Sequence, residues 1–346
     1  MPYIVERIAP YNRSAMKKAE ELLRKEGIER DGNLEYTAAV YDGDKMAATG
    51  SFFGNTIRCV AVGSDYRGEG LLGTVLSHLL SELSQRGTGH VFVYTKWSTA
   101  SRFESLGFYR IADVKDTVVF LENKRDGFES YLQSLENECG GRKGGAAVIM
   151  NANPFTKGHL YLAERAAREN ETLHVFIVSE DKSLVPYEVR KELIKSGLSH
   201  LENVVFHDTG SYMISSATFP AYFLKDSDKV SEGHARLDIE VFSRIAKRLG
   251  ITKRYVGSEN KSRVTSIYNS VMAEVLPQRG IECVVVERVQ SGGRDISASD
   301  VRKALKDGDF KALKELLPPS SLEYFMSDRA KEVIDRIKNT ENVIHH

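Results

Sequence analysis

The segment from Ala146 to Ala167, AAVIMNANPFTKGHLYLAERAA, constrains the fold of this chain more than any other. It opens with the apolar run Ala146–Met150 between glycines and a polar turn, which predicts a buried parallel strand. The turn Asn151–Pro154 follows, and Thr156–His159 then begins a helix with apolar residues on one side. A strand, a sharp turn and a helix N-terminus in this order are typical of phosphate-binding sites.

The first turn of this expected helix carries the residues with the most obvious chemistry. Thr156 and His159 are three residues apart and share a face, and Gly158 between them lets a ligand approach closely. A histidine here can donate a hydrogen bond to a phosphate oxygen and stabilise the charge on a leaving pyrophosphate. The alternative is an ordinary helix cap by Thr156 beside a surface histidine. The flanking strand and helix favour the phosphate site.

A second candidate helix N-terminus lies in the segment ISASDVR, residues 296–302. Ser297 and Ser299 can cap the helix and hydrogen-bond phosphate, and Arg302 shares a face with Ser299, where it can bind two phosphate oxygens. The segment resembles the ISSTxxR motif of the HxGH nucleotidyltransferase superfamily, with departures at Ala298 and Ser299. A capped helix without a ligand is the alternative, but both motifs in the order of that superfamily favour a nucleotide site.

Charge and composition exclude several other classes of function. Lys+Arg and Asp+Glu both number 48, so binding of nucleic acid through bulk charge is not expected. No apolar run approaches a membrane span and the N-terminus lacks a signal-peptide core, so we expect a cytoplasmic protein with no membrane partner. Three cysteines without a CxxC pair suggest neither a disulfide framework nor a metal site: Cys59, Cys139 and Cys283.

The first part of the chain has a different pattern of expected elements. A helix at 14–26 precedes two strands, 36–41 and 45–53, joined by Asp42-Gly43, and a third strand follows at 56–62. The loop Arg67–Leu72 then leads into a helix. It resembles the R/Q-x-x-G-x-G/A pyrophosphate loop of the GNAT acetyltransferases in all but its last position, and residues 101–108 resemble a later segment of that family.

This loop can bind the pyrophosphate of a CoA-type arm through backbone N–H groups at a helix start, with Arg67, Gly68 and Gly70 as the candidate residues. Phe103 stands where many GNAT members have a tyrosine that protonates the departing thiolate, and phenylalanine cannot titrate. We therefore expect a domain that holds a CoA-like arm rather than an independent acetyltransferase. A GNAT-shaped module that binds nothing is the alternative.

After residue 146 expected strands alternate with expected helices, which predicts a doubly wound parallel sheet. The further strands lie at 173–178, 203–207, 254–257 and 281–287. We therefore expect an α/β protein in which a GNAT-like α+β domain precedes a Rossmann-like, HxGH nucleotidyltransferase domain. Its domains are residues 1–127 (GNAT-like), 128–145 (linker) and 146–346 (nucleotidyltransferase-like).

Across nearly the whole chain, the sequence resembles the citrate lyase ligase family. The segments that carry the resemblance are YRGEGLL, NANPFTKGH, SEDKSLVPYEVR, GSYMISSATFPAYFLKD, GSE and ISASDVR. The resemblance implies an enzyme that uses ATP, with Mg²⁺ bridging its phosphates, and acetate to form acetyl-adenylate. The acetyl group then passes to the thiol of the dephospho-CoA-type prosthetic group on the acyl carrier subunit of citrate lyase, and AMP and pyrophosphate are released.

The expected site residues follow from the motifs and from this resemblance. The catalytic candidates are His159, Thr156 and Lys182, the last being a cation just after a parallel strand that could equally be a solvated surface charge. The nucleotide-binding candidates are Asn151, Asn153, Pro154, Phe155, Gly158, Gly257, Ser258, Glu259, Ser297, Ser299 and Arg302.

Three other classes of protein stay open at this point. A nucleotidyltransferase that makes a dinucleotide-type product would release pyrophosphate without acetate. A protein acetyltransferase with a nucleotide-sensing domain would consume acetyl-CoA and no ATP, which Phe103 argues against. A binding module would show no turnover.

Overall fold

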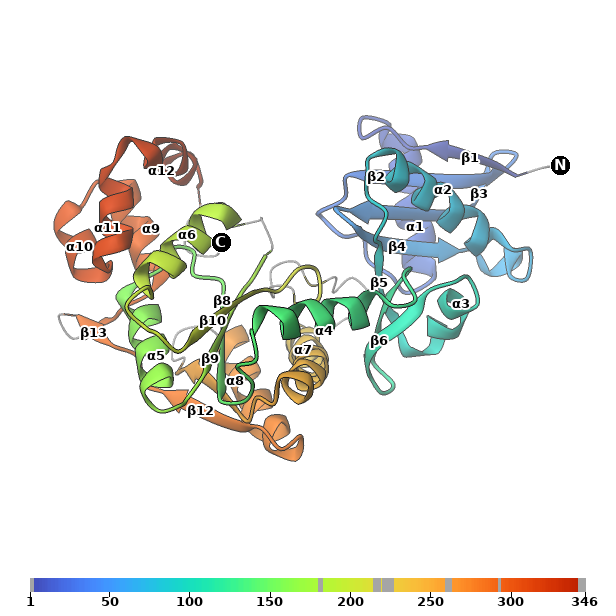
Figure 1. Ribbon diagram of the computed structural model, residues 1–346. Coiled ribbons are helices and arrows are strands. Elements are labelled where there is room, and N and C mark those ends of the chain that lie inside the picture. Colours follow the sequence, from blue (N-terminus) through green and yellow to red (C-terminus); the bar gives the residue numbers. More distant parts are fainter. Residues whose placement is uncertain are drawn as a thin grey trace. The chain divides into compact units, whose positions relative to one another are not determined.

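The computed structural model describes residues 3–179, 183–213, 219, 227–258, 263–291 and 294–341 (Figure 1). The chain forms two compact units. The N-terminal unit comprises residues 1–129 and 220–240, and the C-terminal unit comprises residues 130–219 and 241–346. None of the described helices is both long enough and apolar enough to cross a membrane.

The N-terminal unit is built on one seven-stranded sheet in the order β1-β2-β3-β4-β5-β7-β6. All neighbouring strands are antiparallel except β4 and β5. The strands are β1 (Ile4–Arg7), β2 (Tyr36–Asp42), β3 (Lys45–Phe53), β4 (Thr56–Val62), β5 (Phe92–Lys96), β6 (Tyr109–Val114) and β7 (Val118–Glu122). The helices are α1 (Arg13–Lys25), α2 (Leu71–Gln85) and α3 (Ala100–Glu104), with single 3₁₀ turns at Ser64–Tyr66 and Trp97–Thr99.

Helices α1 and α2 cover opposite faces of this sheet because alternate residues of a strand point to opposite sides. Ala38 and Val40 of β2 belong to the apolar cluster that includes α2, whereas Ala39 between them belongs to the cluster that includes α1. A Cβ atom on Gly50 would lie 2.5 Å from Val75 of α2, so the glycine allows close packing of that helix. The α+β architecture expected for this region is confirmed.

Strands β4 and β5 pair over only two positions, Thr56↔Phe92 and Ile57↔Val93. Strand β4 continues beyond these pairs to Val62 and β5 continues to Lys96. On its other edge β4 pairs with β3, and on its other edge β5 pairs with β7. Among the described residues, the facing edges of these two continuations are not bonded to each other. The two strands therefore diverge beyond their first two paired positions.

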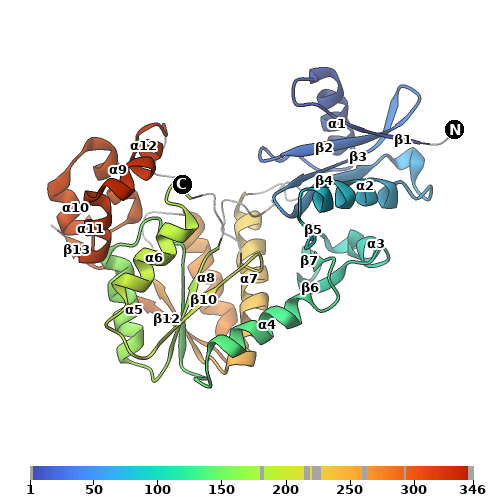
Figure 2. The same ribbon diagram turned by 45° about the horizontal axis from the view of Figure 1, so that its top comes forward.

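The C-terminal unit is built on a five-stranded parallel sheet in the order β10-β9-β8-β11-β12, whose two outermost strands, β10 and β12, are labelled in Figure 2. The strands are β8 (Ala146–Met150), β9 (Leu173–Ile177), β10 (Val204–Asp208), β11 (Lys253–Gly257) and β12 (Glu282–Val286), with a short hairpin of β13 (Gln290–Ser291) and β14 (Arg294–Asp295). This strand order confirms the expected doubly wound parallel sheet.

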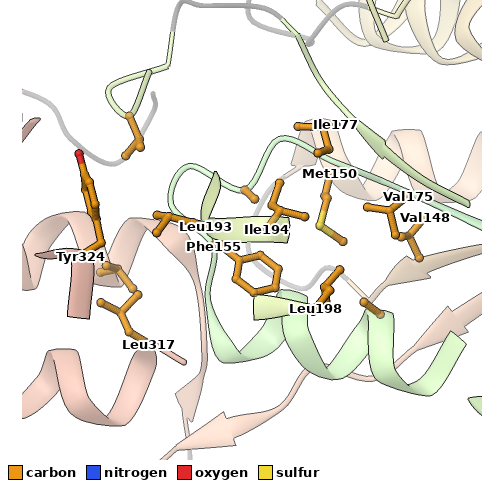
Figure 3. Close-up of a cluster of buried hydrophobic side chains, with 14 of the residues drawn as sticks. Val148, Met150, Phe155, Val175, Ile177, Leu193, Ile194, Leu198, Leu317 and Tyr324 are labelled. Carbon is orange, nitrogen blue, oxygen red and sulfur yellow. The ribbon is translucent and has the colours of Figure 1, made fainter. Parts of the chain in front are cut away.

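The helices from the linker to the C-terminus are α4 (Gly127–Glu138), α5 (Lys157–Arg168), α6 (Tyr187–Gly197), α7 (Ser227–Leu249), α8 (Arg263–Gln278), α9 (Ala298–Asp307), α10 (Phe310–Leu316), α11 (Pro319–Met326) and α12 (Lys331–Lys338), with a 3₁₀ turn at Asp328–Ala330 before α12. One face of the parallel sheet shares a single apolar core with α5, α6 and the C-terminal helices α9 to α12. Figure 3 shows the centre of that core, where Phe155 lies among Met150, Leu193 and Leu198. The other face meets α7, since the rings of Phe176 and Phe242 pack edge to face at 6.3 Å.

The strand order reverses between β8 and β11, and in open α/β sheets ligands bind outside the carboxyl ends of the strands at such a point. These two strands pair only at their amino ends, Lys253↔Ala146 and Arg254↔Ala147. The residues that follow them, Asn151 and Ser258, lie where a crevice is expected.

Candidate active site

Helix α5 begins at the carboxyl end of β8 with a reciprocal cap. The Thr156 Oγ1 atom accepts a hydrogen bond from the backbone N–H of His159 at 3.4 Å, and the backbone N–H of Thr156 donates to Nδ1 of His159 at 3.1 Å. This is a capping box in which histidine takes the place usually held by Glu or Gln. The N–H groups of the first two helical residues remain for a ligand.

The cap fixes the protonation state of the His159 ring. Because Nδ1 accepts from a backbone N–H, the proton of the neutral ring resides on Nε2. Burial, with a smaller contribution from the charge of Arg288, lowers the pKa of His159 from 6.5 to about 4. The ring is therefore neutral near pH 7 and presents one N–H donor, from Nε2.

Helix α9 supplies the second expected N-terminus. Ser297 is its N-cap, and Ser297 Oγ accepts from the backbone N–H of Asp300 at 3.2 Å and donates to the Asp300 carboxylate at 2.6 Å. Ser299 Oγ lies 3.1 Å from a guanidinium nitrogen of Arg302. The sequence motif is therefore a capped helix start in which the polar side chains also bond to each other.

The structure brings the two helix N-termini together. A Cβ atom on Gly158 would lie 3.4 Å from the carbonyl oxygen of Ile296, so the glycine allows the start of α5 to approach the residue before the α9 cap. Arg302 of α9 reaches across and donates to the Asn153 carbonyl at 2.6 Å. Its side chain is 2% exposed, and burial lowers the pKa of Arg302 from 12.5 to about 10.

The turn between β8 and α5 is held from within the protein. Asn151 exchanges side-chain hydrogen bonds with Ser183, and the Asn153 side chain accepts from the backbone of Val185. The Asn153–Pro154 peptide bond is cis. The Phe155 ring is fully buried and stacks on the His159 ring at 5.9 Å. Of the expected residues in this turn, Asn151 is half-buried and the other three, Asn153, Pro154 and Phe155, are buried.

Arg190 of α6 is a further cation at this turn. It is fully buried on α6 and donates to the carbonyl oxygens of Asn151 and Val178, both at 2.8 Å, and of Val185. Arg190 and Arg302 thus hold the carbonyls at the two ends of Asn151–Asn153. Two guanidinium groups beside one turn raise the electrostatic potential there, which favours a polyanionic ligand.

The end of β11 lies beside a second such cation. Gly257 accepts a hydrogen bond from the Asn269 side chain, and the Ser258 carbonyl accepts from Arg288 at 2.7 Å. Arg288 follows β12 by two residues and acts electrostatically on His159, which places its charge near the α5 N-terminus. The rule that favoured Lys182, a cation just past a parallel strand, also fits Arg288. Lys182 and Glu259 themselves lie outside the described residues.

In the N-terminal unit, the loop Arg67–Gly70 begins α2. Gly68 and Gly70 have φ angles of +92° and +74°, and Gly70 caps the helix without a side-chain hydrogen bond. Arg67 is 57% exposed in its side chain and pairs with Glu26 at 2.7 Å, while Tyr3 donates to Glu69. Space is open around both glycines, so a ligand can approach this turn closely.

Comparison with known proteins identifies the family. A family model described as the citrate lyase ligase C-terminal domain matches residues 145–325. The chain is 34% identical to the citrate (pro-3S)-lyase ligase of Klebsiella pneumoniae over 333 residues, which cover 94% of this chain and 97% of that protein. It is also 34% identical to the protein of the same name from Escherichia coli strain K12, over 94% of each chain.

Among solved structures, an acyl-CoA N-acyltransferase from Pseudomonas aeruginosa is similar over 36% of this chain and 99% of its own length, with 11% identity and a TM-score of 0.30. The full-length relatives and the matching family model leave one conclusion: this chain belongs to the citrate lyase ligase family.

Proposed function

We propose that this enzyme acetylates the acyl carrier protein of citrate lyase with ATP and acetate, through an acetyl-adenylate made at the carboxyl ends of β8 and β11. Its family membership makes it an enzyme of this ligase class. The adenylating domain corresponds to residues 146–346 and the arm-binding domain to residues 1–127. The identity of the acceptor arm, a dephospho-CoA-type prosthetic group, is part of the proposal.

One observation carries the nucleotide site: the start of α5 packs on the residue that precedes the cap of α9, with glycine at the contact. Two helix N-termini that meet at the reversal point of a parallel sheet present backbone N–H donors and two partial positive charges to one volume. The guanidinium groups of Arg190, Arg288 and Arg302 add full charges around it. A triphosphate is the ligand that matches this arrangement.

In the first step a carboxylate oxygen of acetate attacks the α-phosphorus of ATP, and the bond to the β-phosphate oxygen breaks. The electron pair leaves with pyrophosphate. The Nε2–H of His159 donates to a phosphate oxygen on which charge develops, and the α5 and α9 N–H groups hold the leaving group. His159 acts by hydrogen bonding and not by proton transfer, because its depressed pKa keeps it neutral.

We propose Mg²⁺ as the companion of ATP, where it would neutralise phosphate charge. Asn151, with a side-chain amide, and Asp300, with a carboxylate, carry hard oxygen ligands at the site. These types fit Mg²⁺ held mainly by phosphate and water. In the second step the arm's thiolate attacks the acetyl carbonyl carbon, the bond to the phosphate oxygen breaks and AMP leaves.

We propose that the Arg67–Gly70 loop binds the pyrophosphate of the acceptor arm. The start of α2, which has no side-chain cap, and the short β4–β5 pairing of only two positions support this role. Phe103 stands where many GNAT members have a tyrosine that protonates the departing thiolate, so this chain has no such acid at that position. The second step does not need one, because its leaving group is AMP and not a thiolate.

Measurement of pyrophosphate release tests the adenylation step. With ATP, Mg²⁺ and acetate, we expect release that depends on acetate and an acyl product that hydroxylamine traps. Release that is independent of acetate, with no trapped product, would instead support a nucleotidyltransferase that makes a dinucleotide-type product.

The variant Gly70→Trp tests the role of the loop. Acetate-dependent pyrophosphate release should persist, while acetyl transfer to the acceptor thiol should be lost. Gly54→Trp is the matched control, because Gly54 also has a positive φ and open surroundings. Equal loss of both steps in Gly70→Trp, with the control intact, would reject the arm-binding role.

A further inference from the structure

A buried group of metal-ligating side chains lies in the C-terminal unit, apart from the proposed nucleotide site. Cys139 follows α4, His174 lies on β9 and His207 on β10, and all three are buried. One ligand atom from each residue lies within 4.8 Å of the other two. His174 alternates along β9 with residues of the α5-side core, so it points to the opposite face of the sheet.

The hydrogen bonds of the two rings determine where their protons are. His174 Nε2 lies 3.0 Å from the carbonyl oxygen of Gly144, and a carbonyl only accepts, so Nε2 carries a proton. His207 Nδ1 lies 2.7 Å from a carboxylate oxygen of Glu138, which places a proton on Nδ1. In neutral rings both remaining nitrogens, His174 Nδ1 and His207 Nε2, then present lone pairs.

These two nitrogens lie 2.9 Å apart. Two lone pairs at this distance repel, so the arrangement requires an electrophile that both can bind. Cys139 Sγ, 4.0 Å from His174 Nδ1, offers a third electron pair to the same point. Either a metal ion or an additional proton meets the requirement.

We propose that Cys139, His174 and His207 bind one Zn²⁺ ion, with a water molecule as the fourth ligand and Glu138 as the outer hydrogen-bond partner of His207. Zinc prefers thiolate and imidazole at about 2.3 and 2.0–2.1 Å in tetrahedral geometry, which separates ligand atoms by roughly 3.3–3.6 Å. The observed separations of 2.9 and 4.0 Å lie on either side of this range, so small side-chain shifts suffice.

The outer contacts and the charge favour metal over a proton. Metal-bound histidines commonly donate their other N–H to a carboxylate or a backbone carbonyl, and here one ring does each. The thiolate and the Glu138 carboxylate together balance the two charges of Zn²⁺. On binding, the Cys139 thiol, now donating to Leu135, releases its proton to solvent.

The site would tie the end of α4 and the Gly144 backbone to the sheet. Cys139 and Gly144 bracket the glycine-rich segment that enters β8, the strand that leads to the nucleotide site. A metal here therefore has a structural role in holding the start of the catalytic sheet.

Titration with Co²⁺ and Zn²⁺ tests the proposal on the full-length chain. The substitutions His345→Ala and His346→Ala are included throughout, since adjacent terminal histidines bind Co²⁺ by themselves. We expect one equivalent of Co²⁺ to bind, with a thiolate-to-cobalt charge-transfer band and the intense visible bands of four-coordinate cobalt. Zn²⁺ should displace the bound Co²⁺, and the zinc-bound protein should have a higher Tm than the metal-free protein.

Three variants complete the test. Cys139→Ser should remove the charge-transfer band. Glu138→Gln should keep the band and weaken Co²⁺ binding by about 10–100-fold. Cys283→Ser is the control and should change neither the band nor the affinity for Co²⁺. X-ray absorption at the zinc edge of the parent protein should show one sulfur and two imidazoles, which holds even if Cys139→Ser fails to fold. Absence of stoichiometric binding, a band that survives Cys139→Ser or a zinc shell without sulfur would overturn the proposal in favour of a proton shared by the two rings.

Discussion

The substitution His159→Asn separates the two functions that the structure gives to this ring. The side-chain oxygen of asparagine occupies the place of Nδ1 and can accept from the Thr156 N–H, as the ring does at 3.1 Å. Asparagine has no group at the place of Nε2, from which His159 donates. The variant therefore keeps the helix cap and loses the proposed donor to phosphate.

The expected magnitudes differ accordingly. Loss of one preorganised donor to a developing oxyanion lowers the rate by about 10²–10³, which corresponds to roughly 3–4 kcal/mol. Retention of the cap limits the change in the free energy of unfolding at neutral pH to about 1 kcal/mol. Single-turnover pyrophosphate release gives the first quantity, and urea unfolding gives the second.

The pH dependence of unfolding provides an independent check. The pKa of His159 is about 4 in the folded protein, against 6.5 when unperturbed. Below pH 6.5 His159 becomes protonated in the unfolded chain but stays neutral in the folded protein. Its contribution to the free energy of unfolding is therefore fully present above pH 6.5 and is lost as pH falls towards 4. Between pH 7 and pH 5 wild type should lose about 2 kcal/mol that His159→Asn does not lose.

Two results would refute this reasoning. One is a single-turnover rate for His159→Asn within about threefold of wild type, because the Nε2–H group would then contribute less than about 1 kcal/mol to the transition state. The other is an ascending pH–rate limb near 6.5 that disappears in the variant, which would show that His159 titrates in the working range and transfers a proton.

Three further substitutions probe the surroundings of the ring. Gly158→Val should separate the start of α5 from Ile296 and raise the KM for ATP at least about tenfold, with about 1–3 kcal/mol of destabilisation; an unchanged KM would contradict the close approach. Arg288→Gln should raise the pKa of His159 in an NMR titration and weaken ATP binding; a constant pKa would remove Arg288 from the site. Gly197→Ala should lower the free energy of unfolding by about 1–3 kcal/mol, because the new Cβ would lie 2.5 Å from the buried ring of Phe155. Urea unfolding identical to wild type would contradict that packing.

The parts of the fold that the sequence predicted are those with local signals. The strand at 146–150 and the caps at Thr156 and Ser297 depend on neighbouring residues, and the structure has them at the expected positions. Alternation of strands and helices predicted the parallel sheet, because a parallel connection needs a crossover. The four-residue strand β1 was not predicted, since it is short and mostly exposed.

The hairpin of β6 and β7 was also missed, for two physical reasons. The register shifts between Arg110 and Ala112, which breaks the twofold alternation that marks a strand. Its turn uses Asp116 at a φ angle of +60° instead of a glycine, so the usual turn signal is absent.

The site contacts that the sequence could not predict join distant residues. Arg302 donates to the carbonyl of Asn153, 149 positions away in the sequence. No local sequence pattern distinguishes an arginine that binds a backbone carbonyl from one that binds phosphate. Its nucleotide-binding role stays a prediction. Arg190 is fully buried although arginine is usually exposed, so its position depends on the assembled turn.

The central claim is that the N-termini of α5 and α9 bind the same triphosphate. The most direct test is a crystal structure of the full chain with a non-hydrolysable ATP analogue and Mg²⁺. We expect phosphate oxygens within hydrogen-bond distance of both His159 Nε2 and the backbone N–H groups at Ala298 and Ser299. Phosphates bound away from either helix start would contradict it.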